Sequence, residues 1–401
     1  MRKQKLIIVG LGMAAVRLLD ELVKRQAQQR YEIVVFGEES HGGYNRIQLS
    51  HVLSGETTLD DITSHDAAWF EQHDMTWFSG RKVVSIDTQA KCLTDATGDV
   101  HDYDNLVLAT GSLPVMVDVA GNNLSGVMYF RDVFDVQRML SLSPNNGRIV
   151  VVGAGLLGLE AAYGLVKQGF EVTVVHRSNR VMSQQLDVAA GALLQTHLES
   201  MGMQFVLSSQ VASIDGVDSV EAVQLSSGET LAAQAVIMAI GIRPNSALAN
   251  DAGLVVNRGV IVDGQCRTSV DDVYAVGECS EFDGQTYGLV APIYRQVSVL
   301  VGQLMGEAVD GFCNLATATQ LKVSGVTLYA FGDPMGQSDT QALVYEDGAK
   351  GVYRKVMLSP QGCVMGAVLL GNINQAQTIF NQYQQAIPVS VAQRAELVFG
   401  Q

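Results

Sequence analysis

Two glycine-rich segments of the same design constrain this chain of 401 residues more than any other feature. In IIVGLGMAA, which begins at Ile7, and in IVVVGAGLLGLE, which begins at Ile149, an apolar β-branched run leads into a Gly-x-Gly turn. The run predicts a buried strand, and the turn opens a helix whose free N–H groups and dipole attract phosphate. Because a second apolar strand follows each copy, we expect two dinucleotide-binding βαβ units.

Three positions of each turn have distinct tasks. The first glycine permits the tight turn, the second lets a pyrophosphate approach the backbone, and the third small residue lets the helix pack closely on the strand. In chain order these positions are Gly10, Gly12 and Ala15 in the first copy and Gly153, Gly155 and Gly158 in the second. The alanine of the first copy is allowed by the G/A form of the fingerprint.

The residue after the second strand of each unit selects the ribose. The first unit has Glu38, whose carboxylate can accept hydrogen bonds from both ribose hydroxyls and so suits the adenosine of FAD, and we interpret the adjacent Glu39 as a solvated turn residue. The second unit has His176, followed by Arg177 and Arg180. Two guanidinium groups can bind a 2′-phosphate, so the second unit can take either NADPH or NADH. The alternative is that the two arginines are exposed loop residues that bind no ligand.

The order of the elements predicts an α/β fold with two Rossmann-like domains and a small C-terminal α+β domain. We expect a discontinuous FAD-binding domain over 1–118 and 245–318, because chains of this design return to the first domain after the second is finished. The NAD(P)H-binding domain is expected over 119–244. From 319 to 401, segments such as VTLYAFG and GVYRKVML alternate apolar and polar residues, which predicts an antiparallel sheet with one helix, INQAQTIFNQYQQA.

Composition excludes several classes of protein. The 26 basic and 41 acidic residues give a net charge of −15, so we expect no nucleic-acid or membrane partner, although acidity can also serve solubility alone. The basic start MRKQK runs directly into the first strand rather than a signal peptide, and we expect a cytoplasmic protein. The five cysteines form no C-x-x-C pair, which argues against a disulfide framework, a metal site, an iron–sulfur cluster and a redox-active dithiol.

Several further motifs carry a family resemblance. With LVLATG, VIMAIGIRPN and VYAVGEC, the double fingerprint resembles the two-dinucleotide pyridine-nucleotide–flavin reductases. YNRIQLSHVLSGE, GLLGLEAAYGL, Gln185-Leu186-Asp187 and GLVAPIY more narrowly resemble the FAD-containing N-terminal part of assimilatory nitrite reductase large subunits and the rubredoxin reductases. The resemblance covers nearly the whole chain. It implies an NAD(P)H oxidoreductase that passes electrons through FAD to a redox protein, either a nitrite or nitrate reductase component or rubredoxin.

The resemblance also implies roles for residues outside the first glycine turn. Glu278 of VYAVGEC takes the place of the acid that binds the ribitol chain of FAD. Asn45 and Arg46 match a segment that passes near the flavin and pyrophosphate. Thr110 and Gly111 form a turn that closes over this first cofactor.

Three residues are implied at the second cofactor and the reacting groups. Gly241 is the counterpart of Gly111 near the nicotinamide nucleotide, and Glu160 takes the place of a carboxylate that faces the nicotinamide and flavin. The alternative for Glu160 is an acid favoured only by the helix dipole. His51 stands where related ferredoxin-type reductases often have a lysine, and its imidazole can donate a hydrogen bond to the flavin without a fixed charge.

Two other interpretations stay open at this point. His51 and the missing ribose acid at His176 are compatible with a flavin-binding regulatory or assembly subunit without significant turnover. The cysteine motifs for an iron–sulfur cluster and sirohaem, which complete nitrite reductases carry downstream, do not occur in this sequence, so the chain can also be a fragment of a longer reductase. The sequence leaves a homo-oligomer open.

Overall fold

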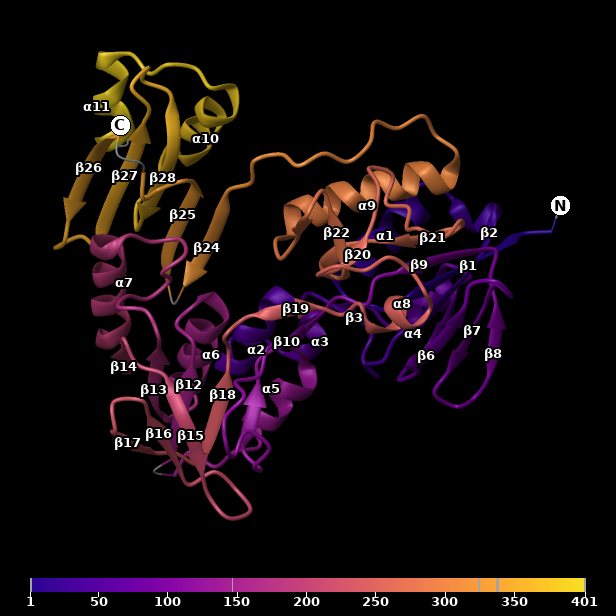
Figure 1. The fold of residues 1–401 in the computed structure, drawn as a ribbon, viewed down its shortest axis with the longest axis horizontal. Coiled ribbons are helices and arrows are strands. Elements are labelled where there is room, and N and C mark those ends of the chain that lie inside the picture. Colours follow the sequence, from indigo (N-terminus) through magenta and orange to yellow (C-terminus); the bar gives the residue numbers. More distant parts are fainter. Residues whose placement is uncertain (1, 146, 324, 337–338, 400–401) are drawn as a thin grey trace. The chain divides into compact units, whose positions relative to one another are not determined.

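The computed structural model describes residues 2–145, 147–323, 325–336 and 339–399 (Figure 1). The chain divides into two compact units, each assembled from three segments. The first unit comprises Met1–Leu49, Thr57–Leu113 and Ile242–Leu315, and the second comprises Ser50–Glu56, Pro114–Gly241 and Ala316–Gln401. The predicted α/β class with Rossmann-like sheets is confirmed. The division into three domains stays a prediction, because the second unit holds both the second fingerprint and the C-terminal sheet.

A five-stranded parallel sheet forms the centre of the first unit, in the order β21-β9-β1-β2-β5. Its strands are β1 (Gln4–Val9), β2 (Tyr31–Phe36), β5 (Thr76–Phe78), β9 (Asn105–Leu108) and β21 (Val273–Ala275). Along β1, Leu6 and Ile8 pack with the helices α1 (Met13–Lys24) and α9 (Val290–Met305), whereas Ile7 and Val9 belong to the core on the other face. Both faces of the sheet are therefore buried, as the uninterrupted apolar run of β1 predicts.

Smaller elements surround this sheet. A three-stranded antiparallel sheet, β6 (Val83–Asp87), β7 (Cys92–Asp95) and β8 (Val100–Asp102), covers the face formed by Ile7 and Val9. The remaining strands are β3 (Gly43–Tyr44), β4 (Thr63–His65), β10 (Ser112–Pro114), β19 (Ile242–Pro244), β20 (Val260–Ile261), β22 (Ser280–Phe282) and β23 (Gln285–Thr286). The short helices are η1 (Ala27–Gln29), η2 (Arg46–Gln48), α3 (Leu59–Ile62), α4 (Ala67–Gln72), α8 (Ala247–Asp251) and η3 (Gly277–Cys279).

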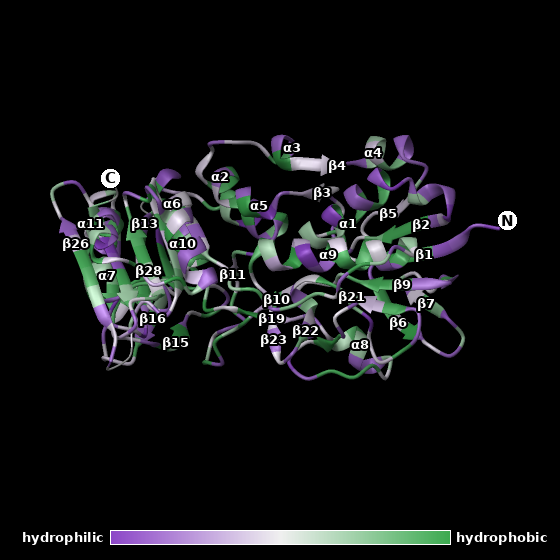
Figure 2. Cartoon of the chain, turned by 90° about the horizontal axis from the view of Figure 1, so that it is seen from above, coloured by the Kyte–Doolittle hydropathy of each residue, from purple (hydrophilic) through white to green (hydrophobic). Residues whose placement is uncertain are grey.

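The second unit repeats the same arrangement around its own parallel sheet, in the order β11-β18-β12-β13-β14. The strands are β11 (Val127–Tyr129), β12 (Arg148–Val152), β13 (Glu171–His176), β14 (Met203–Leu207) and β18 (Ala235–Met238). The helices of this part are α2 (Leu49–Ser54), α5 (Val133–Leu140), α6 (Leu156–Lys167) and α7 (Val188–Ser200). An antiparallel sheet of β15 (Val211–Asp215), β16 (Ala222–Leu225) and β17 (Thr230–Ala232) completes it. Figure 2 shows green, the colour of hydrophobic residues, along parts of β2 and β13, as expected for strands in the interior of a sheet.

A five-stranded antiparallel sheet occupies the C-terminal part of the second unit, in the order β24-β25-β28-β27-β26. Its strands are β24 (Thr319–Val323), β25 (Val326–Gly332), β26 (Gln341–Asp347), β27 (Val352–Leu358) and β28 (Val364–Leu370). Two helices, α10 (Ala376–Gln385) and α11 (Val391–Phe399), accompany the sheet, so the prediction of one helix was incomplete. The buried Arg354 of β27 donates hydrogen bonds to the carbonyls of Asn372, Asn374 and Leu397, each at 3.0 Å, and thereby holds α11.

Within the part of the chain that the structure describes, no helix combines the length and the apolar character needed to cross a bilayer.

Candidate functional site

The first glycine turn has the backbone shape of a phosphate cradle. Gly10 has a φ of +106°, and a Cβ at this position would lie 2.3 Å from the carbonyl oxygen of Ala109, so a side chain has no space there. Gly12 is the N-cap of α1 and makes no side-chain cap. A Cβ at Gly12 would meet nothing within 4 Å, so the turn is open beside this glycine, and no side chain of Gly12 caps the N–H groups of the first helical turn. This arrangement fits a dinucleotide pyrophosphate.

The second turn repeats that geometry closely. Gly153 has a φ of +113°, and its Cβ would lie 2.3 Å from the carbonyl oxygen of Ala239. Gly155 is the uncapped N-terminus of α6, with nothing within 4 Å of an added Cβ. At Gly158 a Cβ would lie 1.9 Å from the carbonyl oxygen of Gly153, so this position has space for glycine only. The second turn therefore fits a second pyrophosphate.

Two adjacent acids follow β2 and have different surroundings. The carboxylate of Glu38 is 63% exposed and accepts a hydrogen bond from the Nζ atom of Lys82 at 2.8 Å. Glu39 is more enclosed, because its two carboxylate oxygens accept hydrogen bonds from Tyr44 Oη and Arg46 Nη2, both at 2.6 Å. The interpretation of Glu39 as a solvated turn residue is therefore wrong. The partners lie on β3 and η2, and the sequence did not show that these short elements turn back toward Glu39.

The segment Tyr44-Asn45-Arg46 is shaped mainly by its own contacts. Asn45 is the N-cap of η2 and accepts a hydrogen bond from the N–H of Ile47 at 3.2 Å. The guanidinium of Arg46 lies 5.1 Å from the ring centroid of Tyr44 as well as binding Glu39. This network holds the loop that follows the first ribose position in one conformation.

The turn at Thr110 and Gly111 is joined to the start of the returning segment. Thr110 Oγ1 donates a hydrogen bond to the carbonyl of Asn245 at 2.6 Å, and the N–H of Asn245 donates to the carbonyl of Gly111 at 2.9 Å. Gly111 has a φ of +68°, which favours glycine. Asn245 was not singled out from the sequence, and it connects two segments of the first unit.

Glu278 lies on η3, directly after a glycine with a positive φ. Gly277 has a φ of +88°, and its N–H donates to the side-chain oxygen of the fully buried Gln296 of α9 at 3.2 Å. Ser112 Oγ donates a hydrogen bond to the Glu278 carboxylate at 2.7 Å. Ser112 and Gln296 thus fix the acid that the resemblance assigns to the FAD ribitol, and only a long-range fold brings them to it.

His176, in the ribose-selecting position of the second unit, is turned toward its own glycine turn. Its Nδ1 atom accepts the N–H of Ala154 at 3.2 Å, and its Nε2 atom lies 3.4 Å from Ser183 Oγ. Burial and the nearby Arg177 lower the pKa of the imidazole, so the ring is neutral at pH 7 and Nδ1 is free to accept. His176 therefore stabilises the phosphate turn through a hydrogen bond to the backbone of Ala154.

The two arginines after His176 differ in their surroundings. Arg177 is exposed. Arg180 donates from Nε to the carbonyl of Leu186 at 2.8 Å and from Nη2 to the carbonyl of Ser183 at 3.1 Å. Its stem packs on α7, where a Cβ at Gly191 would lie 3.1 Å from Arg180 Cβ. Arg180 thus closes the loop onto itself, and Arg177 is the more accessible guanidinium for a 2′-phosphate.

Glu160 lies in the second turn of α6 and is partly buried. Burial raises the pKa of its carboxyl to about 7. The first turn of α6 contains no acid, and the effect of the helix dipole fades beyond that turn, so the dipole alone does not account for this residue. Near neutral pH Glu160 can both hold and release a proton.

His51 lies on α2, which packs on the same helix as Glu160. A Cβ at Gly164 would lie 2.7 Å from Leu53 Cγ, and Gln168 Nε2 donates to the carbonyl of Leu53 at 2.9 Å. The His51 imidazole is half-exposed, 3.8 Å from the Glu56 carboxylate. Both predicted catalytic residues therefore lie on helices that pack together within the second unit.

Gly241 follows β18 of the second parallel sheet and has a φ of +132°. A Cβ there would meet nothing within 4 Å, and its carbonyl accepts the N–H of Val115 at 3.0 Å. Glycine is required at this position by the backbone conformation rather than by crowding.

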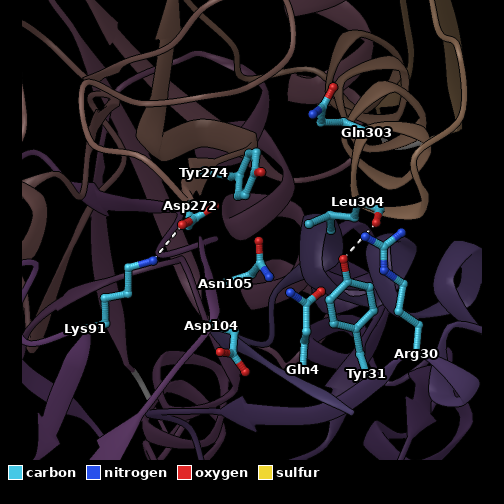
Figure 3. Close-up of a pocket in the computed structure, with 10 residues that line it drawn as sticks. All are labelled: Gln4, Arg30, Tyr31, Lys91, Asp104, Asn105, Asp272, Tyr274, Gln303 and Leu304. Carbon is cyan, nitrogen blue, oxygen red and sulfur yellow. Dashed lines mark hydrogen bonds and ion pairs between the residues drawn. The ribbon is translucent and has the colours of Figure 1, made fainter. Parts of the chain in front are cut away.

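A polar cavity of about 290 Å³ lies in the first unit, at the amino ends of the parallel strands, opposite the end that carries the glycine turn (Figure 3). Two of its charged groups pair with each other, since Lys91 Nζ lies 2.6 Å from Asp272, and the carboxylate of Asp104 accepts the backbone N–H of Lys5 at 2.6 Å. None of the predicted site residues lines it. Among the described residues, no three histidine, cysteine or acidic side chains are grouped to hold a metal ion.

Two uncapped phosphate cradles, each at the end of a central parallel strand, define a two-dinucleotide oxidoreductase. Residues 4–302 match the pyridine nucleotide-disulphide oxidoreductase family, and residues 318–387 match the rubredoxin NAD+ reductase C-terminal domain. The chain belongs to the pyridine nucleotide-disulphide oxidoreductase family. The predicted family, the enzyme class and the cofactors, FAD with NADH or NADPH, are confirmed.

Curated relatives and solved structures agree with this assignment. The chain is 39% identical over 398 residues to a nitrite reductase [NAD(P)H] of Bacillus subtilis, covering 99% of this chain and 49% of the relative. It is 38% identical to an assimilatory nitrate reductase electron transfer subunit of the same organism, covering 98% and 51%. A ferredoxin reductase from Rhodopseudomonas palustris has a TM-score of 0.84 at 26% identity, covering 98% of both chains. The chain thus spans about half the length of these two curated relatives.

Proposed function

We propose that this chain oxidises NADH or NADPH and passes the electrons to a separate redox protein. The observation that carries the proposal is the pair of open, uncapped glycine turns in one chain that has no C-x-x-C pair. Bound FAD would supply the chemistry, because it can accept a hydride and release electrons singly or in pairs. Since the chain offers no dithiol to receive those electrons, an external acceptor is required.

Within the first unit, we assign FAD to the turn of Gly10 and Gly12. The N-terminus of α1 would bind the pyrophosphate, and Glu38 would bind the adenosine ribose in place of its contact with Lys82. Glu278, oriented by Ser112, would bind the ribitol chain. We assign NAD(P)H to the turn of Gly153 and Gly155 in the second unit.

We assign the proton-handling role to Glu160. Its carboxyl has a pKa of about 7, so it can take up or release a proton at neutral pH. That exchange would accompany the change of charge on the nicotinamide beside it. His51, on the adjacent α2, is the more exposed of the two and would tune the flavin through a hydrogen bond rather than a fixed charge.

For the acceptor we propose a nitrite or nitrate reductase component, with rubredoxin as the second choice. The first choice is supported by the two Bacillus subtilis relatives, and the second by the match of residues 318–387. The net charge of −15 favours an acceptor with a basic or mixed face and disfavours nucleic acid. Isolated, unpaired cysteines suit the reducing cytoplasm, where we place the reaction.

An anaerobic titration tests this proposal. The purified chain should bind FAD, and NADH or NADPH should bleach the visible flavin absorption within seconds. The reduced protein is then mixed with rubredoxin, ferredoxin or a nitrite reductase component, and reoxidation of the flavin identifies the acceptor. Well-folded protein without flavin, or bound flavin that neither nucleotide reduces, would refute the proposal, and the second result would favour a regulatory or assembly subunit.

A further inference from the structure

The loop of residues 177–187 joins β13 to α7 and binds the second phosphate turn directly. The N–H of Met182 donates to the carbonyl of Ala154 at 2.8 Å, and the N–H of Ala154 donates to His176 Nδ1 at 3.2 Å. Met182 is buried and has a φ of +49°, a conformation that a side chain other than glycine seldom adopts. Ala154 lies between the two cradle glycines. Its carbonyl is therefore held by this loop, and its N–H is held by His176 at the end of the preceding strand.

Strain at Met182 persists only if its surroundings hold it in place. Inside the loop, Arg180 provides part of that restraint through its bonds to the carbonyls of Ser183 and Leu186. The N–H groups of Gln185 and Leu186 both donate to the carbonyl of Met182, each at 2.9 Å. The loop is therefore a closed structure whose last residue is Asp187.

Asp187 fixes the end of the loop to two different elements. Its Oδ1 atom accepts the N–H of Ala190 at 3.0 Å as the N-cap of α7. Its Oδ2 atom accepts hydrogen bonds from Tyr353 Oη at 2.6 Å and from Lys355 Nζ at 2.9 Å, both on β27 of the C-terminal sheet. The Asp187 and Lys355 side chains are only 15% and 13% exposed, so this charge-assisted contact is far less screened than a surface ion pair.

Burial alone would raise the pKa of Asp187, but hydrogen bonds from Tyr353, Ala190 and Lys355 outweigh it and lower that pKa. The carboxylate therefore stays ionised at neutral pH, and the contact with Lys355 persists there.

The strand that carries Tyr353 and Lys355 lies inside the C-terminal sheet. β27 pairs with β26 on one side and β28 on the other. Tyr353 and Lys355 are two residues apart and so share one face, while Arg354 between them points to the other face and bonds to the carbonyls of Asn372, Asn374 and Leu397. The C-terminal sheet thus offers a fixed anchor for Asp187.

We propose that Asp187 is a positioning residue through which the C-terminal sheet holds the loop 177–187, and with it the phosphate turn at Gly153–Gly155, in the conformation that binds the nicotinamide nucleotide. The identity of that nucleotide rests on the proposed function. The C-terminal domain thereby contributes to binding of the electron donor, a role separate from any contact with an acceptor.

The chain provides a matched control for this contact. In the same C-terminal sheet, Asp347 lies 3.3 Å from Lys350 Nζ and 3.5 Å from Tyr345 Oη. This second Asp–Lys–Tyr group lies within one hairpin, and among the described residues no hydrogen bond or ion pair joins it to residues 177–187. The test variants are Asp187→Asn, Tyr353→Phe and Lys355→Met, and the controls are Asp347→Asn, Tyr345→Phe and Lys350→Met.

Two measurements on the flavin-containing protein test the proposal. Hydrogen–deuterium exchange without nucleotide should be about tenfold faster for the amides of residues 178–186 in Asp187→Asn and Lys355→Met, since loss of about 1.4 kcal/mol of restraint raises the open population tenfold. Stopped-flow reduction should give a Kd for NADH and for NADPH that rises about five- to twentyfold, with a limiting reduction rate within about threefold of the parent protein. The controls should change neither quantity by more than about twofold.

Unchanged exchange and unchanged Kd in both Asp187→Asn and Lys355→Met would overturn the proposal, as would equal changes in the controls. If Asp187→Asn fails to fold, Tyr353→Phe and Lys355→Met supply the same comparison. If the parent protein does not reduce its flavin with either nucleotide, the proposed function fails, whereas the exchange experiment still decides whether the C-terminal sheet holds the loop.

Discussion

The two phosphate turns of this chain have nearly the same backbone and very different support. At both, the first glycine donates its N–H to the end of the second strand at 2.8 Å, to Phe36 in one and to Val175 in the other. After that strand the first unit places two acids that contact Lys82, Tyr44 and Arg46. The second unit places an imidazole that binds back onto the turn. The cradle itself thus specifies a pyrophosphate, while the strand end determines how the rest of the nucleotide is held.

The largest expected effects separate the two cradles. Gly10→Ala and Gly153→Ala each place a Cβ 2.3 Å from a carbonyl oxygen at a positive φ, which should cost about 2–4 kcal/mol locally. We expect Gly10→Ala to lose bound FAD, measured as flavin absorbance per protein. Gly153→Ala should retain FAD but lose reduction by NAD(P)H.

The control for these variants is Gly228→Ala, because Gly228 has a φ of +90° but nothing within 4 Å of an added Cβ. Gly228→Ala should keep both its bound FAD and its reduction by NAD(P)H. If Gly153→Ala loses flavin as completely as Gly10→Ala, the assignment of one nucleotide to each turn is wrong.

The next effect concerns the Glu160 carboxyl on α6, the helix that follows the second cradle. The pKa of Glu160 is about 7 in the folded chain, above its ordinary value of 4.5, so the folded state binds the proton more tightly than the unfolded state. Stability from this group is therefore present below pH 4.5 and is lost as the pH rises through 7. Glu160→Gln should raise the free energy of unfolding at pH 8 by about 2–3 kcal/mol, with the gain shrinking toward pH 5.

The same substitution should remove a step near pH 7 from the pH profile of the flavin reduction rate. Thermal unfolding at several pH values and stopped-flow reduction are the two measurements, and Glu199→Gln, a surface change on α7, is the control. A profile that keeps its step near pH 7 in Glu160→Gln would assign that step to another group.

A smaller effect sharpens the difference between the two arginines of the second unit. Arg177→Ala should weaken NADPH binding about tenfold, the loss expected for one charge-assisted contact to a 2′-phosphate, and change NADH binding by less than about twofold. Arg180→Ala should weaken both nucleotides together, because Arg180 bonds to loop carbonyls. Arg148→Ala, at an exposed arginine of the same unit, is the control. Equal binding of NADPH before and after Arg177→Ala would remove Arg177 from the site.

The smallest effect concerns the first ribose position. Glu38→Gln should weaken FAD binding about three- to tenfold while changing the free energy of unfolding by no more than about 0.5 kcal/mol, since its contact with Lys82 is an exposed pair. Lys82→Met breaks the same pair without touching the acid and should leave FAD binding unchanged. Equal losses in both variants would show that Glu38 acts through the pair rather than on the ribose.

The sequence predicts what depends on neighbouring residues. Apolar runs and their glycines predict both cradles, because the strand, turn and helix are contiguous in the chain. It could not show that His176 accepts the N–H of Ala154 or that Arg180 bonds to loop carbonyls, since either residue could equally have faced solvent. The prediction also missed the helix α11, whose place depends on the hydrogen bond from Arg354 to the carbonyl of Leu397, a contact between residues far apart in the sequence.

The contact of Asp187 with Tyr353 shows the same limit more sharply. An aspartate before a helical stretch is a normal N-cap signal, and Asp187 does cap α7. Its second set of partners is brought to it by the packing of the C-terminal sheet, and no local pattern in the sequence encodes that packing.

The discontinuity of the first unit also determines the order in which the chain can be completed during synthesis. The five strands of the second parallel sheet all lie between residues 127 and 238, so they leave the ribosome as one continuous stretch. The first parallel sheet still lacks β21, and its packed face still lacks α9, until residues up to Met305 have been made. Long-range closure of this kind is slow and leaves apolar surface exposed meanwhile. The cradle at Gly10 is therefore translated before the second parallel sheet, whereas β21 and α9, which complete its own sheet and core, are translated after it.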